Sequence, residues 1–399
     1  MESIPTHTTL GPGTSSLAAD WLTSRSRTGM LVLFRKLRHT DVVRRSTMPT
    51  KHIDSPADLQ GLLQKLPRFP LAHLPTPLEH LPRFSEALNG PRIWIKRDDC
   101  TGLAFGGNKT RHNELLIADA LQKGADTIVW GAGIQSNNCR QTAAACAKAG
   151  LDCHLVLGRG RPAAGPDPVQ GNLLIDHLVG ASIEIVDEPE GPDVDRKIAH
   201  AAQRLRNAGR NVYERDPDYV KPLAALSYVT CVLELVEQAA HAEFTPDAIY
   251  VCSSGSTGAG ISLALAALGL GIPVQHAAPI VWPWDTQAAM TRIANDAAER
   301  LGISTRLESG DINVTENYVG PGYGIPTPGC LEAITLLART EGILLDPSYS
   351  GKSMACLIDH IRQGKLQPDD NVVFIHTGGT PVLFACNEQL TEEIDRPSF

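Results

Sequence analysis

The chain has 399 residues, of which 42% are hydrophobic and 20% are charged, and its net charge is −8. The length allows two domains with separate cores, the composition is typical of a globular enzyme, and the negative charge excludes the basic surface of a nucleic-acid-binding protein. No apolar run approaches the ~20 residues of a membrane-spanning helix, so we expect no membrane partner. The nine cysteines are odd in number, scattered and without a C-x-x-C pair. This pattern argues against a disulfide framework or a metal site and favours a cytoplasmic location.

The first 55 residues differ in composition from the remainder. Residues 1–50 contain seven arginine or lysine residues against three acidic ones, together with many serines and threonines. Such a composition is typical of an organellar transit segment. A disordered tail, or a later start at Met30 or Met48, are the alternatives. We interpret residues 1–55 as an N-terminal extension that is disordered or transit-like, with a mitochondrial location as the alternative to the cytoplasm.

From about residue 66 the chain alternates between strand and helix patterns. Strands are predicted at 93–99, 127–133 and 153–158, helices at 113–124, 138–150 and 195–209, a helix followed by a strand within 171–186, and a strand followed by a helix within 247–271. This alternation predicts an α/β fold with parallel sheets covered by helices on both faces.

Three glycine-containing turns are candidates for a ligand site: GGNK at 106–109, GAGIQSNN at 131–138 and SSGSTGAG at 253–260. Ligands of open α/β sheets bind beyond the carboxyl ends of the strands, where such turns lead into helices. The third turn follows the strand AIYVC and offers backbone N–H groups at a helix start, which suits a phosphate. It matches neither G-x-x-x-x-G-K-[ST] nor G-x-G-x-x-G, so ATP and NAD are poorly supported. A tight turn without a ligand is the alternative.

The other two turns suggest a carboxylate site and a nucleophile. Ser136, Asn137 and Asn138 precede a helix and can hold a carboxylate with neutral donors, although helix capping by Ser136 or Asn137 is the more ordinary explanation of the turn taken alone. Lys109 directly follows Gly-Gly-Asn and could be a surface charge, a phosphate contact or an amine nucleophile. A phosphate turn, a carboxylate turn and a presented lysine together suggest pyridoxal phosphate acting on an amino acid.

Several long motifs resemble one enzyme family. They are KRDDCTGLAFGGNKTR, GIQSNNCRQTAAACAKAG, YGIPTPG, EGILLDPSYSGKSMACLID and FIHTGGTPVLF, in colinear order over roughly residues 66–386. The family is that of the pyridoxal-phosphate enzymes 1-aminocyclopropane-1-carboxylate deaminase, D-cysteine desulfhydrase and L-cysteate sulfo-lyase. The resemblance implies the tryptophan-synthase β-like fold (fold type II), in which two α/β domains enclose the cofactor, and a homodimer. It places a small inserted domain at 111–220 and a large cofactor-binding domain at 56–110 and 221–399.

The resemblance also assigns roles to individual residues. Lys109 matches the lysine that binds the cofactor covalently, and Asn108 the donor to the phenolic oxygen of the cofactor. The remaining matches are Ser136, Asn137 and Asn138 for the substrate carboxylate, Ser254, Gly255, Ser256 and Thr257 for the phosphate, Tyr323 and Tyr349 for two active-site tyrosines, and Ser350 and Thr377 for the pyridine nitrogen. The residues with expected catalytic roles are Lys109, Ser136, Tyr323 and Tyr349, and no metal is expected.

Ser350 and Thr377 distinguish between the subfamilies. The resemblance places glutamate and leucine at these positions in the deaminases, whereas hydroxyl residues are desulfhydrase-like. A carboxylate near the pyridine nitrogen keeps it protonated and strengthens the electron sink that opening a cyclopropane needs. Elimination of a good β-leaving group needs a weaker electron sink, for which a hydroxyl residue near the pyridine nitrogen is sufficient. We therefore expect β-elimination from a small amino acid, D-cysteine first and L-cysteate second, with Lys109 removing the Cα proton and Tyr323 or Tyr349 assisting the leaving group or packing as an aromatic wall.

Three departures from the family pattern keep alternatives open. His112 stands where the family usually has a phosphate-binding lysine, and Asn138 where the desulfhydrases usually have histidine. The segment 213–228 lacks the family's G-G-S-N sequence and is expected to bring bulk and charge there through Asp216, Asp218, Tyr219 and Lys221. This segment indicates either a different substrate or a loop that has moved away from the pocket. A 1-aminocyclopropane-1-carboxylate deaminase and a catalytically idle pyridoxal-phosphate-binding relative remain the alternatives.

Overall fold

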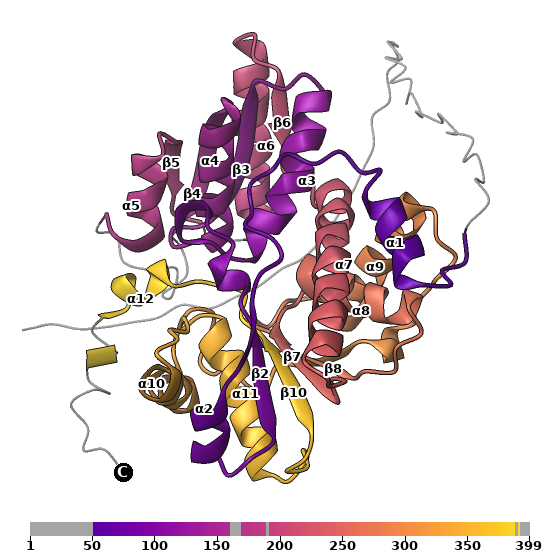
Figure 1. The fold of residues 1–399 in the computed structure, drawn as a ribbon. Helices are drawn as coiled ribbons and strands as arrows, with labels where there is room; N and C mark the ends of the chain where they lie inside the picture. Colours follow the sequence, from indigo (N-terminus) through magenta and orange to yellow (C-terminus); the bar gives the residue numbers. More distant parts are fainter. Residues whose placement is uncertain (1–50, 160–168, 189–190, 388–389, 392–399) are drawn as a thin grey trace, which may run out of the picture. The chain divides into compact units, whose positions relative to one another are not determined.

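The computed structural model describes residues 51–159, 169–188, 191–387 and 390–391 (Figure 1). Residues 1–50, which carry the transit-like composition, lie outside the described residues, and that interpretation stays a prediction. The first helix, α1 (Pro56–Leu63), follows Ser55, whose hydroxyl accepts a hydrogen bond from the Asp58 N–H at 3.2 Å. This is a regular N-cap.

The strands form two separate sheets. The six-stranded sheet has the order β1 (Leu78–His80), β2 (Arg92–Lys96), β10 (Asn371–Ile375), β7 (Ala248–Cys252), β8 (Val274–Ala277) and β9 (Asn313–Thr315). The four-stranded sheet has the order β5 (Ser182–Val186), β4 (Asp152–Gly158), β3 (Thr127–Gly133) and β6 (Val212–Glu214). All neighbouring pairs are parallel except β1 with β2, so the predicted parallel α/β architecture is confirmed.

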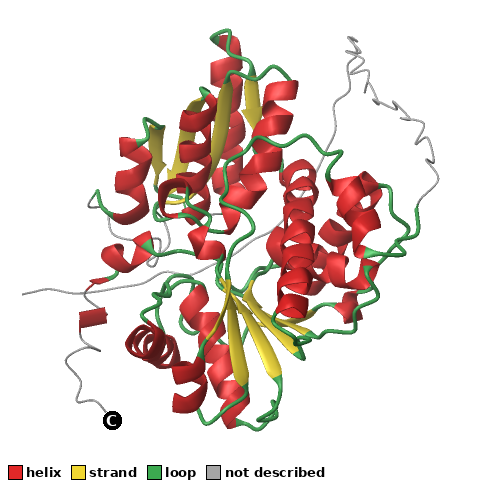
Figure 2. Ribbon diagram, in the orientation of Figure 1, coloured by secondary structure: helices red, strands yellow, loops and turns green. Residues whose placement is uncertain are grey.

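Helices cover both faces of the four-stranded sheet, as Figure 2 shows. Ile128 and Leu155 pack with the apolar residues of α4 (Asn137–Ala149) and α5 (Gly171–Leu178), whereas Val129 and Val156 pack with those of α6 (Pro192–Asn207). Neighbouring residues of a strand point to opposite faces, so the uninterrupted apolar sequence of β3 follows from burial on both sides.

The six-stranded sheet is covered in the same way. Ile249 and Val251 pack against α7 (Pro217–His241), α8 (Ser256–Ala267) and α9 (Thr286–Leu301). Tyr250 faces the other side, with apolar residues of α2 (Pro82–Ala87), α10 (Pro328–Glu341) and α11 (Ser350–Arg362). The short helix α12 (Pro381–Ala385) follows β10. Each sheet therefore has a core on both faces.

Two helices begin where the sequence did not predict them. α3 spans Asn108–Gln122 and starts five residues before the predicted helix, because its first turns consist of polar residues that are buried by ion pairs and hydrogen bonds rather than by apolar contacts. α7 begins at Pro217 inside the altered segment, with Asp216 as N-cap and Pro222 within the helix. The predicted domain boundaries at 110/111 and 220/221 fall inside these two helices, and they stay a prediction.

α7 also bears on the expectation of no membrane segment. It is the one helix in the described part of the chain that is long and apolar enough to cross a membrane, and 67% of its most apolar 18-residue window is buried. Glu234 and Glu237 interrupt its apolar sequence, so no continuous run is evident in the sequence. Its contacts with α3, α8 and α9 are those of a core helix.

Candidate active site

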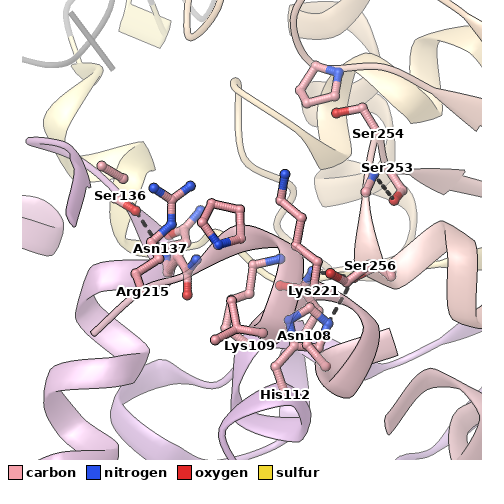
Figure 3. A pocket seen from close by; sticks show the side chains of 18 of the residues that line it. Asn108, Lys109, His112, Ser136, Asn137, Arg215, Lys221, Ser253, Ser254 and Ser256 are labelled. Carbon is pink, nitrogen blue, oxygen red and sulfur yellow. Dashed lines mark hydrogen bonds between the residues drawn. The ribbon is translucent and has the colours of Figure 1, made fainter. Parts of the chain in front are cut away.

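A cavity of about 300 Å³ lies where α3, α4, α7 and α8 begin (Figure 3). This volume is within the usual range for small-ligand pockets. Eleven of the predicted site residues line it: Asn108, Lys109, Ser136, Asn137, Asn138, Ser254, Gly255, Ser256, Thr257, Tyr349 and Thr377. The structure therefore brings together three turns that lie far apart in the sequence.

The two glycines before Asn108 and Lys109 are required by close backbone approach. Gly106 has a φ of +64°, and a Cβ there would lie 2.1 Å from the Asp99 carbonyl oxygen. Gly107 has a φ of +121°, and a Cβ there would lie 2.8 Å from the side-chain amide nitrogen of Gln141. Only glycine tolerates this packing and these dihedral angles. The packed turns place Asn108 and Lys109 at the first two positions of α3, facing the cavity.

Lys109 has the properties of a reactive amine. Its side chain makes no hydrogen bond or ion pair with any described residue, and burial lowers its pKa from 10.5 to about 8. The neighbouring Cys252 thiol does not supply a counter-charge, because burial raises the pKa of that thiol well above its usual value. About one tenth of Lys109 is therefore neutral at about pH 7, far more than for a lysine of ordinary pKa, and this favours nucleophilic or general-base action.

Asn108, His112 and Thr257 surround the lysine, and we call these four residues the cavity floor. The Asn108 side-chain amide donates to the Thr257 hydroxyl at 3.0 Å, and the His112 Nε2 lies 3.2 Å from the same oxygen. Burial, followed by the charges of Lys109 and Arg111, lowers the pKa of His112 well below its usual value. His112 is therefore a neutral hydrogen-bonding residue and not a cationic substitute for lysine.

A buried ion cluster supports the cavity floor from behind. Arg111 is fully buried and binds Asp98 at 2.8 and 2.9 Å and Glu234 at 2.8 and 2.7 Å. Lys96 also binds Glu234, at 3.0 Å. Burial opposes ionisation of Asp98, but Arg111 outweighs it and holds the pKa of this carboxyl below its usual value. Two cations and two carboxylates thus balance, and they fix the first turn of α3 in place.

The start of α8 offers backbone donors to a ligand. Its N-cap is Gly255, which makes no side-chain capping bond, and a Cβ on Gly255 would meet no atom within 4 Å. The Ser253 hydroxyl accepts from the Gly258 N–H at 2.8 Å and so closes the turn. The turn therefore presents the N-terminus of a 12-residue helix to the cavity, which is an arrangement that binds phosphate.

The start of α4 is capped and also lines the cavity. The Ser136 hydroxyl accepts from the N–H groups of Asn138 and Cys139, each at 3.2 Å, so the capping interpretation is confirmed. Gln141 ties this turn to α3, because it accepts from the Thr110 N–H at 2.8 Å and donates to the Asn137 carbonyl at 3.0 Å. A carboxylate bound at this turn is thereby held at a fixed distance from Lys109.

Two predicted site residues do not line the cavity. The hydroxyl of Tyr323 hydrogen-bonds to that of Tyr349, which does line it, so Tyr323 lies one residue further back. Ser350 is buried, donates to the Asp346 carboxylate at 2.6 Å and accepts from the Asp346 N–H at 2.8 Å. The resemblance alone did not indicate these contacts.

The altered segment lines the cavity, and the idea that it has moved away was wrong. Arg215, Pro217, Val220 and Lys221 form one side of the cavity, which we call the cavity wall. They lie there because β6 ends at Glu214, beside β3, and α7 begins directly afterwards. The sequence shows that this segment is charged but not that its charged side chains point into the cavity, because charge alone does not locate a helix start.

Two tryptophans were missed altogether. Trp282 and Trp284 stack at 4.7 Å between ring centroids and line the cavity, and the Trp282 Nε1–H donates to the Ser254 hydroxyl at 3.2 Å. They follow β8, and residues beyond the carboxyl end of a parallel strand are candidates for ligand contact. β8 was not predicted from the sequence, so this position gave no usable signal before the fold was known.

The residues present fit a pyridoxal phosphate. The cavity combines an amine without an ionic partner, a helix start without a side-chain cap that suits a phosphate, and an amide donor, Asn108, beside that amine. These are the groups needed to bind an aldehyde, a phosphate and a phenolic oxygen.

Comparisons with known proteins agree with this fit. The model of the family "Pyridoxal-phosphate dependent enzyme" matches residues 70–378. A 1-aminocyclopropane-1-carboxylate deaminase of Burkholderia ambifaria (strain MC40-6) is 41% identical over 333 residues, which cover 82% of this chain and 98% of that protein, and one of Burkholderia lata is 40% identical over 333 residues with the same coverage. The crystal structure of an ACC deaminase homologue has a TM-score of 0.76 at 33% identity and covers 84% of this chain and 98% of that one.

The chain therefore belongs to the pyridoxal-phosphate dependent enzyme family, and its cofactor is pyridoxal phosphate. The crystal structure of a T.th. threonine deaminase matches with a TM-score of 0.56 at 19% identity, covering 81% of this chain and 97% of that one, which supports the fold alone. The predicted fold type II architecture is confirmed by these structural matches.

Proposed function

We propose that the enzyme is a lyase that eliminates a β-substituent from a small amino acid, with D-cysteine as the first candidate substrate and L-cysteate as the second. The observation that carries this proposal is the lack of an unpaired carboxylate at the cavity. Among the described residues that line it, Asp195 is the only acidic one, and it is paired with Arg215. Ser350 and Thr377, at the positions that the resemblance gives to the pyridine nitrogen, are both uncharged.

Pyridoxal phosphate, held by Lys109, Asn108 and the start of α8, would supply the electron sink for the electrons of the Cα–H bond. The start of α4, with Ser136, Asn137 and Asn138, orients the substrate carboxylate. Lys109, with its pKa lowered to about 8 by burial, takes the Cα proton. Tyr349, supported by Tyr323, supplies a proton to the leaving group. For cysteine, the Cβ–S bond breaks, the sulfur leaves with its electron pair as sulfide, and water converts the remaining fragment to pyruvate and ammonia.

A second candidate is 1-aminocyclopropane-1-carboxylate deamination. It is favoured by the names of the relatives at 40–41% identity. The deaminase reaction requires a stronger electron sink, and Asp346, which could supply negative charge, is hydrogen-bonded to Ser350 and does not line the cavity. A catalytically idle relative is the remaining alternative.

A substrate panel distinguishes these candidates by the product formed. D-cysteine and L-cysteate give pyruvate on β-elimination, whereas the cyclopropane substrate gives a four-carbon 2-oxo acid. We expect pyruvate from D-cysteine or L-cysteate and little four-carbon product. Preference for the cyclopropane would contradict the proposal, and a coloured holoenzyme that forms neither acid would identify an idle relative.

We further propose a homodimer in the cytoplasm. The dimer follows from the resemblance. The nine cysteines are all free, and seven of them are buried, which is consistent with a reducing compartment. Light scattering of the purified holoenzyme tests the dimer.

A further inference from the structure

The cavity is lined by more positively charged residues than the one lysine that binds the cofactor. The charged residues that line it are Lys109, Arg215, Lys221 and Asp195. Arg215 forms an ion pair with Asp195, and this pair is neutral overall. Lys109 is assigned to the cofactor. Lys221 is left as a cation that faces the cavity.

Lys221 has no ionic partner of its own. It makes no salt bridge or hydrogen bond with any described residue, although its side chain is partly buried. Burial, and then the neighbouring charge of Arg215, lowers its pKa. A desolvated ammonium without a partner is unfavourable, and an anionic ligand would relieve this cost.

The position of Lys221 indicates which ligand meets it. It belongs to the cavity wall, in the first turns of α7, and Arg215, Asp195 and Asp218 are among the charges that act on it. The cavity floor, in contrast, holds Lys109 and His112 beside Thr257. Figure 3 shows the Lys221 amine rising from α7 into the space between Arg215 and the Ser253–Ser254 turn, above Lys109. The amine thus faces the open cavity above Lys109, which we assign to the side chain of the substrate.

We propose that Lys221 selects an amino-acid substrate whose side chain carries a second anionic group, such as a sulfonate or a carboxylate. This inference rests on the proposed function for the amino-acid part of the ligand. It deepens that function by naming the substrate class: of the two candidate substrates proposed above, it favours L-cysteate, whose side chain is a sulfonate, over D-cysteine. Lys221 acts as the charge-pairing residue for the side chain, because the charge of Arg215 is already balanced by Asp195.

The test compares binding of aspartate with that of its neutral isostere asparagine, using both enantiomers of each. Neither compound has a good β-leaving group, so both report binding to the full-length holoenzyme without turnover. Dissociation constants are measured from the change in visible absorbance on titration, with cysteate as a third ligand. We expect aspartate to bind about tenfold more tightly than asparagine, which is the effect of one favourable charge pair of ~1.4 kcal/mol.

Variants of Lys221 then assign the preference. In Lys221→Met the ratio of the two dissociation constants should fall to about one, and in Lys221→Arg it should be retained, because only the second variant keeps the positive charge. Lys148→Met, which changes an exposed lysine near the end of α4, is the matched control and should leave the ratio unchanged. Equal binding of aspartate and asparagine by the unmodified enzyme would overturn the proposal.

A second measurement separates the substrate from the cofactor. If Lys221→Met weakened pyridoxal phosphate binding and left the aspartate-to-asparagine ratio intact, the lysine would serve the cofactor phosphate and the proposal would be wrong. If only the proposed lyase activity were wrong, the enzyme would form no pyruvate but would still bind aspartate more tightly than asparagine.

Discussion

The floor and the wall of the same cavity are built in different ways. Three of the four floor residues are held by hydrogen bonds, because Asn108 and His112 both bind Thr257, and Lys109 stands on the first turn of α3, which the buried Arg111 cluster supports from behind. On the wall, Arg215 pairs with the partly exposed Asp195, and Lys221 has no ionic partner among the described residues. A fixed floor suits a cofactor that every catalytic cycle uses, and a less constrained wall suits the recognition of a particular side chain. The comparison predicts that changes to the floor affect chemistry and stability, whereas changes to the wall affect substrate choice.

The largest effect is expected for Lys109→Ala on the floor. The substitution removes the amine that binds the cofactor and takes the Cα proton, so turnover should fall about 10⁴-fold. The visible absorbance of the lysine-bound cofactor should disappear as well. Steady-state kinetics and an absorbance spectrum measure both. Retained absorbance and activity would show that another amine does this work, and Lys148→Ala should match the unmodified enzyme.

The next effect concerns the cluster behind the floor. Arg111→Met leaves Asp98 and Glu234 buried with less positive charge, and we expect the free energy of unfolding to fall by about 3–5 kcal/mol. Arg362→Met, which breaks the exposed pair with Glu332, is the control and should cost less than about 1 kcal/mol. Urea denaturation of both variants gives the values. Similar losses in the two variants would mean that the cluster does not support the floor.

A smaller effect is expected in the pH dependence of cofactor uptake. Only the neutral amine of Lys109 reacts with an aldehyde, and burial lowers its pKa to about 8. The neutral fraction therefore grows as the pH rises, by about tenfold between roughly pH 7 and pH 9. Stopped-flow absorbance after mixing cofactor-free enzyme with pyridoxal phosphate should give a rate that levels off above about pH 9. A rate still rising steeply at about pH 10 would indicate a lysine with an ordinary pKa.

Much of the cavity outside the wall could be predicted from the sequence. The Gly-Gly-Asn-Lys turn, the serine- and glycine-rich turn before α8 and the Ser-Asn-Asn turn before α4 each follow a recognisable strand or precede a recognisable helix, and all three line the cavity. These signals are local, because backbone dihedrals and helix starts depend on neighbouring residues. β3 was predicted with the bounds that the structure shows, because burial on both faces produces a continuous apolar run.

The wall could not be predicted in the same way. From the sequence, segment 213–228 could only be described as lacking the glycine-rich loop of the family. The start of α7 at Pro217 was needed to show which of its charged side chains face the cavity. The hydrogen bond of Ser350 with Asp346 was equally hidden, because it depends on how α11 begins. Trp282 and Trp284 enter the cavity only because β8 ends next to β7.

The α/β class, the reactive lysine with its glycines and the three turns can all be read from the linear chain, because each depends on chemistry within a few residues. The fold was needed to show that Arg111 is neutralised by residues 13 and 123 positions away, that the pKa of Lys109 is about 8, and that Lys221 faces the cavity. Desolvation and charge pairing depend on which distant segments come together, and a linear pattern does not contain that information.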